Sequence, residues 1–261
     1  MDNRGRGSHA SRETDLREKK NIDKNGTFHA TILRPTLPTN KEHSVERQIA
    51  VIDPAMNRAE TDCFNLLVGS SPLPMTYHLP KLAGMDSLHA DRGTIAGIII
   101  LGSACSVNDG FEWQTQMNAW LKPKLEAGIP TIGLCYGHQL LSHLFGAKVD
   151  FVFEDKRKHS GLRTVHLKKN RLWGEATQGS LVVSHREAVQ TCPAGFEVVG
   201  ASPEVAVDAI AHTRLPIWGF QSHPESSPSF LKSQGIAAET KSLEFGWNLM
   251  RAFLRFVADR R

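Results

Sequence analysis

The sequence lacks the features that mark membrane, secreted and zinc-binding proteins. No apolar run approaches the roughly 20 residues that cross a bilayer, and the N-terminus lacks the apolar core of a signal peptide. The four cysteines are widely spaced without a Cys-x-x-Cys pair, which argues against a disulfide framework and a zinc ribbon. The twelve histidines form no cluster with zinc-ligand spacing. We therefore expect a cytoplasmic protein without a metal or another cofactor, and without a membrane partner.

Most of the chain also carries almost no excess of basic over acidic residues. Residues 1–47 hold ten Lys/Arg and seven Asp/Glu, whereas the remainder holds twenty-one against twenty. A nucleic-acid-binding protein carries its basic excess on the folded part, so we expect no nucleic-acid partner. Residues 1–47 also lack apolar periodicity. They predict a disordered polar and basic extension, followed by one domain over residues 48–261.

What the sequence does contain is an alternation of apolar runs and helical spacing. Strands are predicted at 48–53, 75–79, 94–101 and 129–134, and helices at 58–68, 112–127 and 137–145. This alternation predicts an open, mostly parallel, doubly wound α/β sheet with flanking helices, whose reactive groups gather at the carboxyl ends of the strands. Shorter runs predict a smaller antiparallel region and a closing helix: strands at 149–153, 162–167, 181–184, 197–201, 206–212 and 217–221, and the helix at 243–257.

The stretch 131–141 carries the clearest functional signal. Cys135 follows a predicted strand and precedes a helix, so its thiol would lie where unpaired N–H groups and the helix dipole favour a thiolate. Gly133 and Gly137 flank it two residues to each side and leave room for a sharp turn. A buried structural cysteine is the alternative, and a histidine elsewhere in the chain would favour the nucleophile.

His223 is the histidine best suited to that task. It ends an apolar strand and precedes Pro224, which holds its backbone extended. Glu225 could bond one ring nitrogen, fix the tautomer and leave the other nitrogen for the thiol. Alone, this would be a strand end with a chance carboxylate. Beside Cys135 it predicts a Cys-His-Glu triad.

A third segment offers backbone donors. The strand at 94–101 ends in Gly102 and Ser103, whose N–H groups could join that of Tyr136 in an oxyanion hole. An ordinary turn after a strand is the alternative reading of this segment.

These segments together resemble the class I (triad) glutamine amidotransferases, including the amidotransferase unit of GMP synthase and its stand-alone relatives. The matching motifs are Gly133-Leu-Cys-Tyr-Gly-His-Gln139, Gly219-Phe-Gln-Ser-His-Pro-Glu225 and, less specifically, Val182-Val-Ser-His185. The resemblance implies a flavodoxin-like fold and hydrolysis of glutamine through a γ-glutamyl thioester, with release of ammonia. It assigns catalysis to Cys135, His223 and Glu225, and substrate binding to Gly102, Ser103, Tyr136, Gln139, Ser184 and His185.

One segment departs from the family pattern. Gly102-Ser103-Ala104 stands where the family usually has Gly-Gly-Pro. The second glycine often has a backbone conformation that a side chain resists. The enzyme would then either need a partner to organise the turn or accept a different γ-glutamyl substrate.

Three functions are compatible with the sequence. The first is a glutaminase that supplies ammonia to a biosynthetic acceptor in a separate synthetase subunit, because no acceptor domain follows the amidotransferase-like region. The second is a stand-alone γ-glutamyl hydrolase acting on a small γ-glutamyl compound. The third is a catalytically silent binding subunit, against which the intact Cys135, His223 and Glu225 argue.

Overall fold

The computed structural model describes residues 20–22, 28–30, 46–90 and 93–260. The chain divides into two units, residues 1–44 and 45–261. In the first, β1 (Lys20–Ile22) and β2 (Phe28–Ala30) form a short antiparallel pair. The predicted disordered extension of residues 1–47 lies mostly outside the described residues and stays a prediction.

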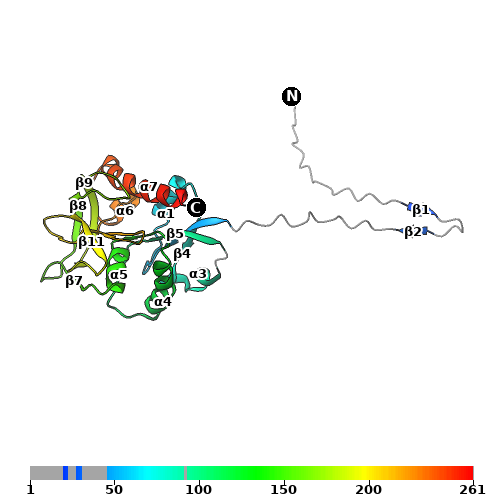
Figure 1. The fold of residues 1–261 in the computed structure, drawn as a ribbon, viewed down its shortest axis with the longest axis horizontal. Coiled ribbons are helices and arrows are strands. Elements are labelled where there is room, and N and C mark those ends of the chain that lie inside the picture. The colour runs from blue at the N-terminus through cyan, green and yellow to red at the C-terminus, as the bar shows by residue number, and fades with distance from the viewer. Residues whose placement is uncertain (1–19, 23–27, 31–45, 91–92, 261) are drawn as a thin grey trace, which may run out of the picture. The chain divides into compact units, whose positions relative to one another are not determined.

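The second unit is built on a nine-stranded sheet of order β4-β3-β5-β6-β13-β12-β11-β8-β9 (Figure 1). The first five strands in that order are parallel neighbours: β4 (Met75–His78), β3 (Arg47–Ile52), β5 (Thr94–Ile100), β6 (Thr131–Leu134) and β13 (Ile217–Phe220). The antiparallel strands extend the same sheet: β12 (Ala209–His212), β11 (Phe196–Ala201), β8 (His159–Leu167) and β9 (Thr177–His185). The predicted α/β sheet with an antiparallel region is confirmed. β7 (Val149–Phe151) and β10 (Glu187–Val189) form a separate antiparallel pair.

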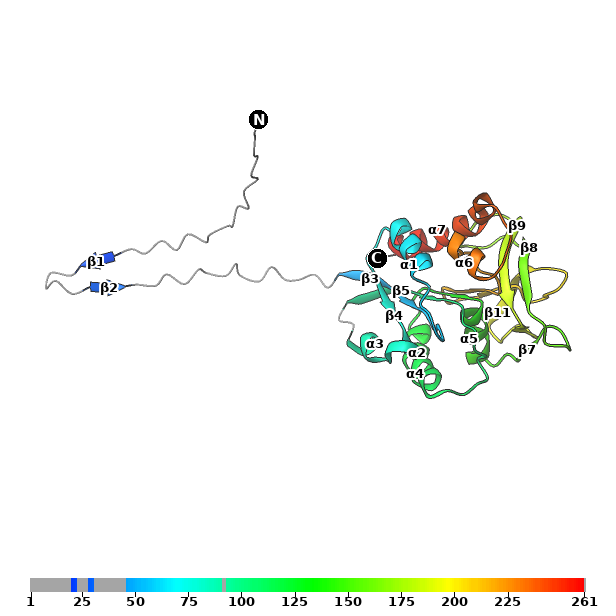
Figure 2. The ribbon, with the colours of Figure 1, turned by 180° about the vertical axis from the view of Figure 1, so that it is seen from behind.

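Helices cover both faces of this sheet (Figures 1 and 2). One face carries α1 (Thr61–Ser70), α6 (Pro228–Ser233), the 3₁₀ turn η1 (Thr240–Leu243) and α7 (Glu244–Asp259). The other carries α2 (Pro80–Ala83), α3 (Asp86–Ala90), α4 (Glu112–Glu126) and α5 (Tyr136–Leu144). Successive side chains of a strand point to opposite faces, so in β5 Ile99 joins the first core whereas Ile98 and Ile100 join the second. Burial on both faces explains the continuous apolar run of this strand.

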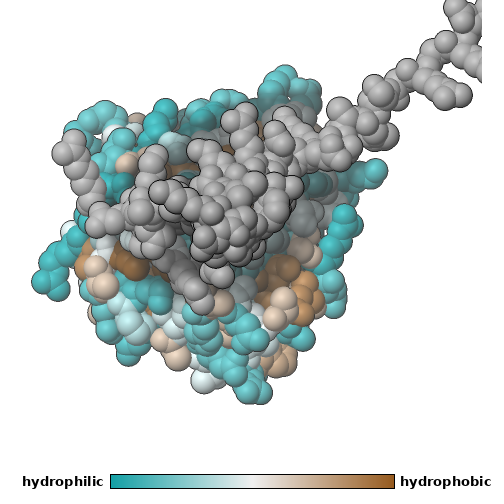
Figure 3. Space-filling model, turned by 90° about the vertical axis from the view of Figure 1, so that its right-hand side faces the viewer, coloured by the Kyte–Doolittle hydropathy of each residue, from teal (hydrophilic) through white to brown (hydrophobic). Residues whose placement is uncertain are grey.

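On one face of the second unit, the part that Figure 3 leaves uncovered is mainly hydrophilic. Figure 3 shows hydrophilic residues interrupted by small hydrophobic areas on the face that it presents. No helix among the described residues has the length and apolar character needed to cross a membrane.

The register of the parallel strands determines where the candidate site forms. β5 pairs with β6 as far as Ile100 and Gly133, and β13 pairs with β6 as far as Phe220 and Leu134. These three strands therefore end at one edge of the sheet, and the residues that follow them meet there.

Candidate active site

Cys135 forms the turn between β6 and α5. Its φ of 51° lies in the region that side chains rarely adopt, and among the described non-glycine residues only Lys156 shares this feature. Gly133 and Gly137 allow the turn: a Cβ on Gly133 would lie 2.4 Å from the backbone of Gly137, and one on Gly137 would lie 2.4 Å from the Ile100 carbonyl oxygen. The thiol is buried and lies at the N-terminus of α5. This is the strained elbow that the sequence predicts.

The imidazole of His223 lies beside the Cys135 side chain and against the carboxylate of Glu225. The Nδ1 atom of His223 lies 3.0 Å from Oε1 of Glu225, and both side chains are buried. Nε2 has no hydrogen-bond partner of standard geometry among the described residues, which leaves it for the thiol. Burial alone lowers the pKa of His223, but Cys135 and Glu225 outweigh that effect and raise the pKa to about 10. The site therefore favours the protonated imidazolium form of His223 beside Cys135.

Gly102 brings the backbone after β5 against both groups. A Cβ on this residue would lie 2.6 Å from Cε1 of His223 and 3.5 Å from Cβ of Cys135. The Tyr136 hydroxyl accepts a hydrogen bond from the Gln114 amide at 3.0 Å, away from the cavity. Only the Tyr136 backbone N–H, in the first turn of α5, can therefore serve the site.

Ser103 occupies its turn without a left-handed backbone conformation. Its hydroxyl donates to the Pro54 carbonyl oxygen at 2.7 Å and lies 3.0 Å from Sγ of Cys105. The hydrogen bond to Pro54 thus joins the turn after β5 to the loop after β3. The serine side chain fits at the position where the departure from Gly-Gly-Pro predicted a conformational conflict.

These groups line a cavity of about 560 Å³. Eight of the nine predicted site residues contribute to its wall, with Tyr136 as the exception: Gly102, Ser103, Cys135, Gln139, Ser184, His185, His223 and Glu225. Ser184 and His185 come from the end of β9, and the Ser184 hydroxyl donates to Oε1 of Gln234 at 2.7 Å. The cavity has the size of a small-molecule site.

Sequence reasoning missed several groups in this wall. Asp53 directly follows β3 and is fully buried, and its Oδ2 accepts hydrogen bonds from the Glu60 N–H at 2.8 Å and from the Tyr77 hydroxyl. Burial raises the pKa of Asp53, and burial followed by the charge of Asp53 raises the pKa of Glu60. The end of a buried strand at the reactive edge was the available signal for Asp53, whereas no motif marks Glu60.

Gln221 was also missed as a neighbour of the thiol. It is fully buried at the end of β13, and its Nε2 lies 3.8 Å from Sγ of Cys135. It stands inside the motif that ends at Glu225, which was the available signal. Within the described part of the chain, no group of three His, Cys, Asp or Glu side chains is arranged to hold a metal ion.

Solved structures share this fold. A glutamine amidotransferase from Thermotoga maritima aligns with a TM-score of 0.65 and 14% identity over 84% of this chain and 100% of that chain. A glutamine amidotransferase from Methylobacillus flagellatus gives 0.62 and 16% over 84% and 96%. At these identities the likeness establishes the fold.

Sequence relationship establishes the family. Residues 75–241 match the family glutamine amidotransferase class-I, and the chain belongs to that family. The glutamine-hydrolysing GMP synthase of Streptococcus mutans is 35% identical over 133 residues, 49% of this chain and 24% of the relative. That of Streptococcus pyogenes serotype M49 is 39% identical over 102 residues, 38% and 20% of the two chains. The chain thus spans about a quarter or less of these relatives. The predicted resemblance to class I amidotransferases is confirmed.

Proposed function

We propose that the protein hydrolyses the side-chain amide of glutamine, with Cys135 as nucleophile, His223 as acid and base, and Glu225 as the carboxylate that orients His223. The observation that carries this proposal is the meeting of a strained, buried cysteine with an imidazole held 3.0 Å from a buried carboxylate, all in the wall of one cavity. A nucleophile, its base and the orienting group are the parts that acyl transfer requires.

The reaction proceeds in two steps. The Cys135 thiolate attacks the amide carbon, and the backbone N–H groups at Gly102 and Tyr136 stabilise the oxyanion that forms. The His223 imidazolium donates its proton to the departing nitrogen, the C–N bond breaks, and ammonia leaves a γ-glutamyl thioester on Cys135. His223 then takes a proton from water, the water oxygen attacks the thioester, and the C–S bond breaks to release glutamate.

The substrate amino acid would lie in the same cavity, against the wall that includes Gln139, Ser184 and His185. The Gln139 side chain and the backbone at Ser184 and His185 belong to this wall and would provide polar groups for the α-amino and α-carboxylate groups. Ser103 contributes by fixing the turn that carries the oxyanion donors, since its hydroxyl bonds to the Pro54 carbonyl.

We assign the ammonia to a biosynthetic acceptor in a separate synthetase subunit. The support is the family and the match to an amidotransferase-sized part of glutamine-hydrolysing GMP synthases. Mixing the protein with candidate synthetases tests this assignment. If ammonia is delivered, the synthetase forms its product when glutamine is added, and ammonium salts can take the place of glutamine and this protein.

A second candidate is a γ-glutamyl hydrolase, which the size of the cavity favours. Glutamine has about ten non-hydrogen atoms, and each occupies no more than ~30 Å³, which is the volume of one water molecule in the liquid. Bound glutamine would therefore fill about half of the 560 Å³ cavity. The remaining space would accept a leaving group larger than ammonia. A panel of γ-glutamyl amides separates the candidates by their kcat/KM relative to glutamine.

Replacing the nucleophile tests the chemistry itself. We expect Cys135→Ala and Cys135→Ser to reduce glutamate release from glutamine to the background of an enzyme-free sample, because the thioester can no longer form. Intact-mass spectrometry of the wild-type protein quenched during turnover should show the added γ-glutamyl group. Cys192→Ser, which changes an exposed free cysteine, is the matched control and should retain activity. Equal release by Cys135→Ala and the wild type would refute the proposal.

A further inference from the structure

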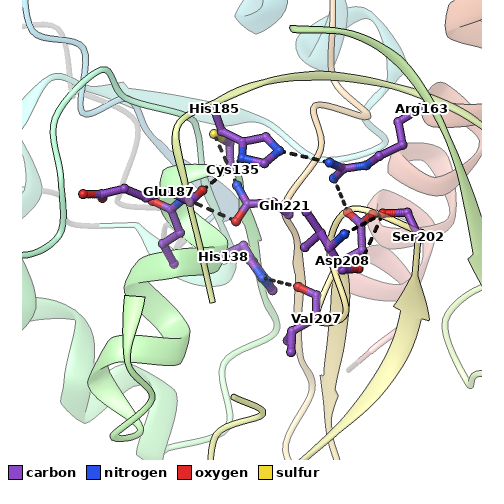
Figure 4. Close-up of polar contacts among 11 residues, drawn as sticks. Cys135, His138, Arg163, His185, Glu187, Ser202, Val207, Asp208 and Gln221 are labelled. Carbon is purple, nitrogen blue, oxygen red and sulfur yellow. Dashed lines mark hydrogen bonds and ion pairs between the residues drawn. The ribbon is translucent and has the colours of Figure 1, made fainter. Parts of the chain in front are cut away.

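A buried ion pair lies behind the wall that carries His185. Nη2 of Arg163, on β8, lies 2.7 Å from Oδ1 of Asp208, and the two side chains are 3% and 0% exposed (Figure 4). The other Lys/Arg–Asp/Glu pairs of the described residues are at the surface. Removing two charges from water is costly, and well-packed apolar residues often serve stability as well. A pair in this place therefore calls for a role beyond stability.

Arg163 determines the tautomer of His185. Its Nη1 lies 3.1 Å from Nε2 of His185. A guanidinium can only donate hydrogen bonds, so Nε2 must accept and the proton must reside on Nδ1. Nδ1 lies 3.0 Å from the Glu187 carbonyl oxygen and donates to it. Burial, followed by the charge of Arg163, lowers the pKa of His185 to about 3, so the ring stays neutral.

The Nδ1–H group of His185 holds the Glu187 carbonyl oxygen in place, and this oxygen also binds Gln139. It accepts from Nε2 of Gln139 at 2.7 Å, and the second hydrogen of that amide points to Oε1 of Gln221 at 3.3 Å. Gln221 in turn reaches Sγ of Cys135. Both hydrogens of the Gln139 amide are thus used, and no described residue donates to its oxygen. That oxygen is the free hydrogen-bonding atom of a side chain that lines the cavity.

We propose that Arg163 and Asp208 are positioning residues for the substrate amino acid, which act through His185 and the Glu187 carbonyl to present the Gln139 amide oxygen to the α-ammonium group of a γ-glutamyl substrate. The inference rests on the proposed function. An amide turned by 180° would present its NH₂ group, which cannot accept from an ammonium. Without its proton, Nδ1 of His185 would repel the Glu187 carbonyl oxygen, so the ion pair that keeps the proton there also keeps this oxygen in position for Gln139.

Substrate binding by network variants tests this role. In Arg163→Met/Asp208→Asn no charge is left buried without a partner. We expect this variant to raise the KM for glutamine, and the Kd measured by calorimetry in the Cys135→Ala background, by about tenfold, the effect of one well-placed hydrogen bond. The kcat should change less than about threefold, because the bond is equally present in ground and transition states. A folded double variant with unchanged KM and Kd would overturn the proposal.

A matched control separates positioning from general loss of stability. Leu167 lies on the same strand as Arg163 and is buried in the apolar core. Leu167→Ala should lower the unfolding temperature while leaving the KM for glutamine unchanged. If the double variant does not fold, Arg163→Lys keeps a charge for Asp208, yet a single ammonium does not reproduce the fork that reaches both partners. The same rise in KM is expected, and its absence in folded Arg163→Lys would count equally against the proposal.

The tautomer can be measured without substrate. Long-range ¹⁵N–¹H spectra of the histidine rings, with His185→Gln to assign the signal, should show His185 as a neutral Nδ1–H tautomer in the wild type. A mixture of tautomers is expected in the network variants. A wild-type Nε2–H tautomer, or a single Nδ1–H tautomer in a folded double variant, would overturn the inference. Because this readout needs no turnover, it is distinct from a failure of the wild type to release glutamate, which would overturn the proposed function.

Discussion

At the scale of single residues, the geometry of this site depends on a close approach of the backbone to the reactive side chains. Gly102 has no room for even one more carbon, since a Cβ would lie 2.6 Å from the His223 ring. Cys135 has a strained backbone conformation, and the turn that contains it is possible because Gly133 and Gly137 carry no side chain. The reactivity that we propose therefore depends on glycines as much as on the triad.

Gly102→Ala tests this dependence. The added methyl group must displace the imidazole, and a displacement of about 1 Å costs on the order of 100-fold in rate. We expect kcat/KM for glutamine to fall by about that factor in steady-state assays, with little change in unfolding temperature. Gly69→Ala in α1 is the control: no atom lies within 4 Å of its Cβ position, and alanine favours a helix. Activity in Gly102→Ala equal to that of Gly69→Ala would contradict the close approach.

The raised pKa of His223 gives the second prediction at this scale. A group whose pKa is raised keeps its proton to higher pH, so the imidazolium that protonates the departing nitrogen should persist until the pH approaches about 10. Glu225→Gln removes one of the two charges that raise this pKa. We expect the alkaline decline of kcat/KM to move to lower pH by about one unit or more, because the pKa of His223 falls.

A pH–rate profile between pH 6 and 10.5 measures this shift. Glu187→Gln makes the same chemical change in the same cavity, and the Glu187 carboxylate is not one of the leading causes of the raised pKa of His223. Its profile should match that of the wild type. An unshifted alkaline decline in Glu225→Gln would show that the carboxylate does not support the imidazolium.

At the scale of elements, the apolar runs predicted the parallel half of the sheet well. Both faces of these strands are buried, as at Ile98 to Ile100 and at Ile132 to Leu134. Each strand is therefore a continuous apolar run, which can be recognised from the sequence alone. The helix after Cys135 was predicted at 137–145 and spans 136–144. Strand ends at a common edge then brought the predicted triad together.

Elements without an apolar pattern of their own could not be found. α2 has four residues, α3 five and α6 six, too few for helical periodicity to appear. β9 begins at Thr177 rather than at 181, because its first residues are exposed or half-buried and hold their place by pairing with β8. The helix predicted at 58–68 spans Thr61 to Ser70, since residues before it form the loop that contacts Ser103.

The hydrogen-bond network that supports the site, including Arg163 and Asp208, could not be predicted from the sequence either. Arg163 and Asp208 are 45 residues apart and stand in no motif, so only the pairing of β8 with β9 and β11, and of β11 with β12, reveals their contact. The serine in the Gly102-Ser103-Ala104 turn was noticed, but its bond to the Pro54 carbonyl needed the fold. Whether a partner further organises that turn stays a prediction.

At the scale of the whole molecule, the site lies where the two halves of the sheet contribute to one cavity. The parallel strands supply Gly102, Cys135 and His223, whereas the antiparallel end supplies Ser184 and His185. We therefore expect the chemistry and the recognition of the amino acid to depend on different halves. The fall in kcat/KM of Gly102→Ala would come from kcat, whereas the Arg163 variants would change KM.

Truncation tests whether residues 46–261 suffice for this assembly. β3 pairs with β4 and β5 inside that span, and the Arg47 guanidinium donates to the Val257 carbonyl oxygen at 3.0 Å, which joins β3 to α7. We expect a chain of residues 46–261 to keep the glutaminase activity of the full chain. Its unfolding temperature should stay within about 3 °C, the shift of ~1 kcal/mol for a domain of this size. A chain of residues 51–261 loses four of the six residues of β3 and should not fold. Activity lost in the 46–261 chain while its unfolding temperature is kept would show that residues 1–45 contribute to the site.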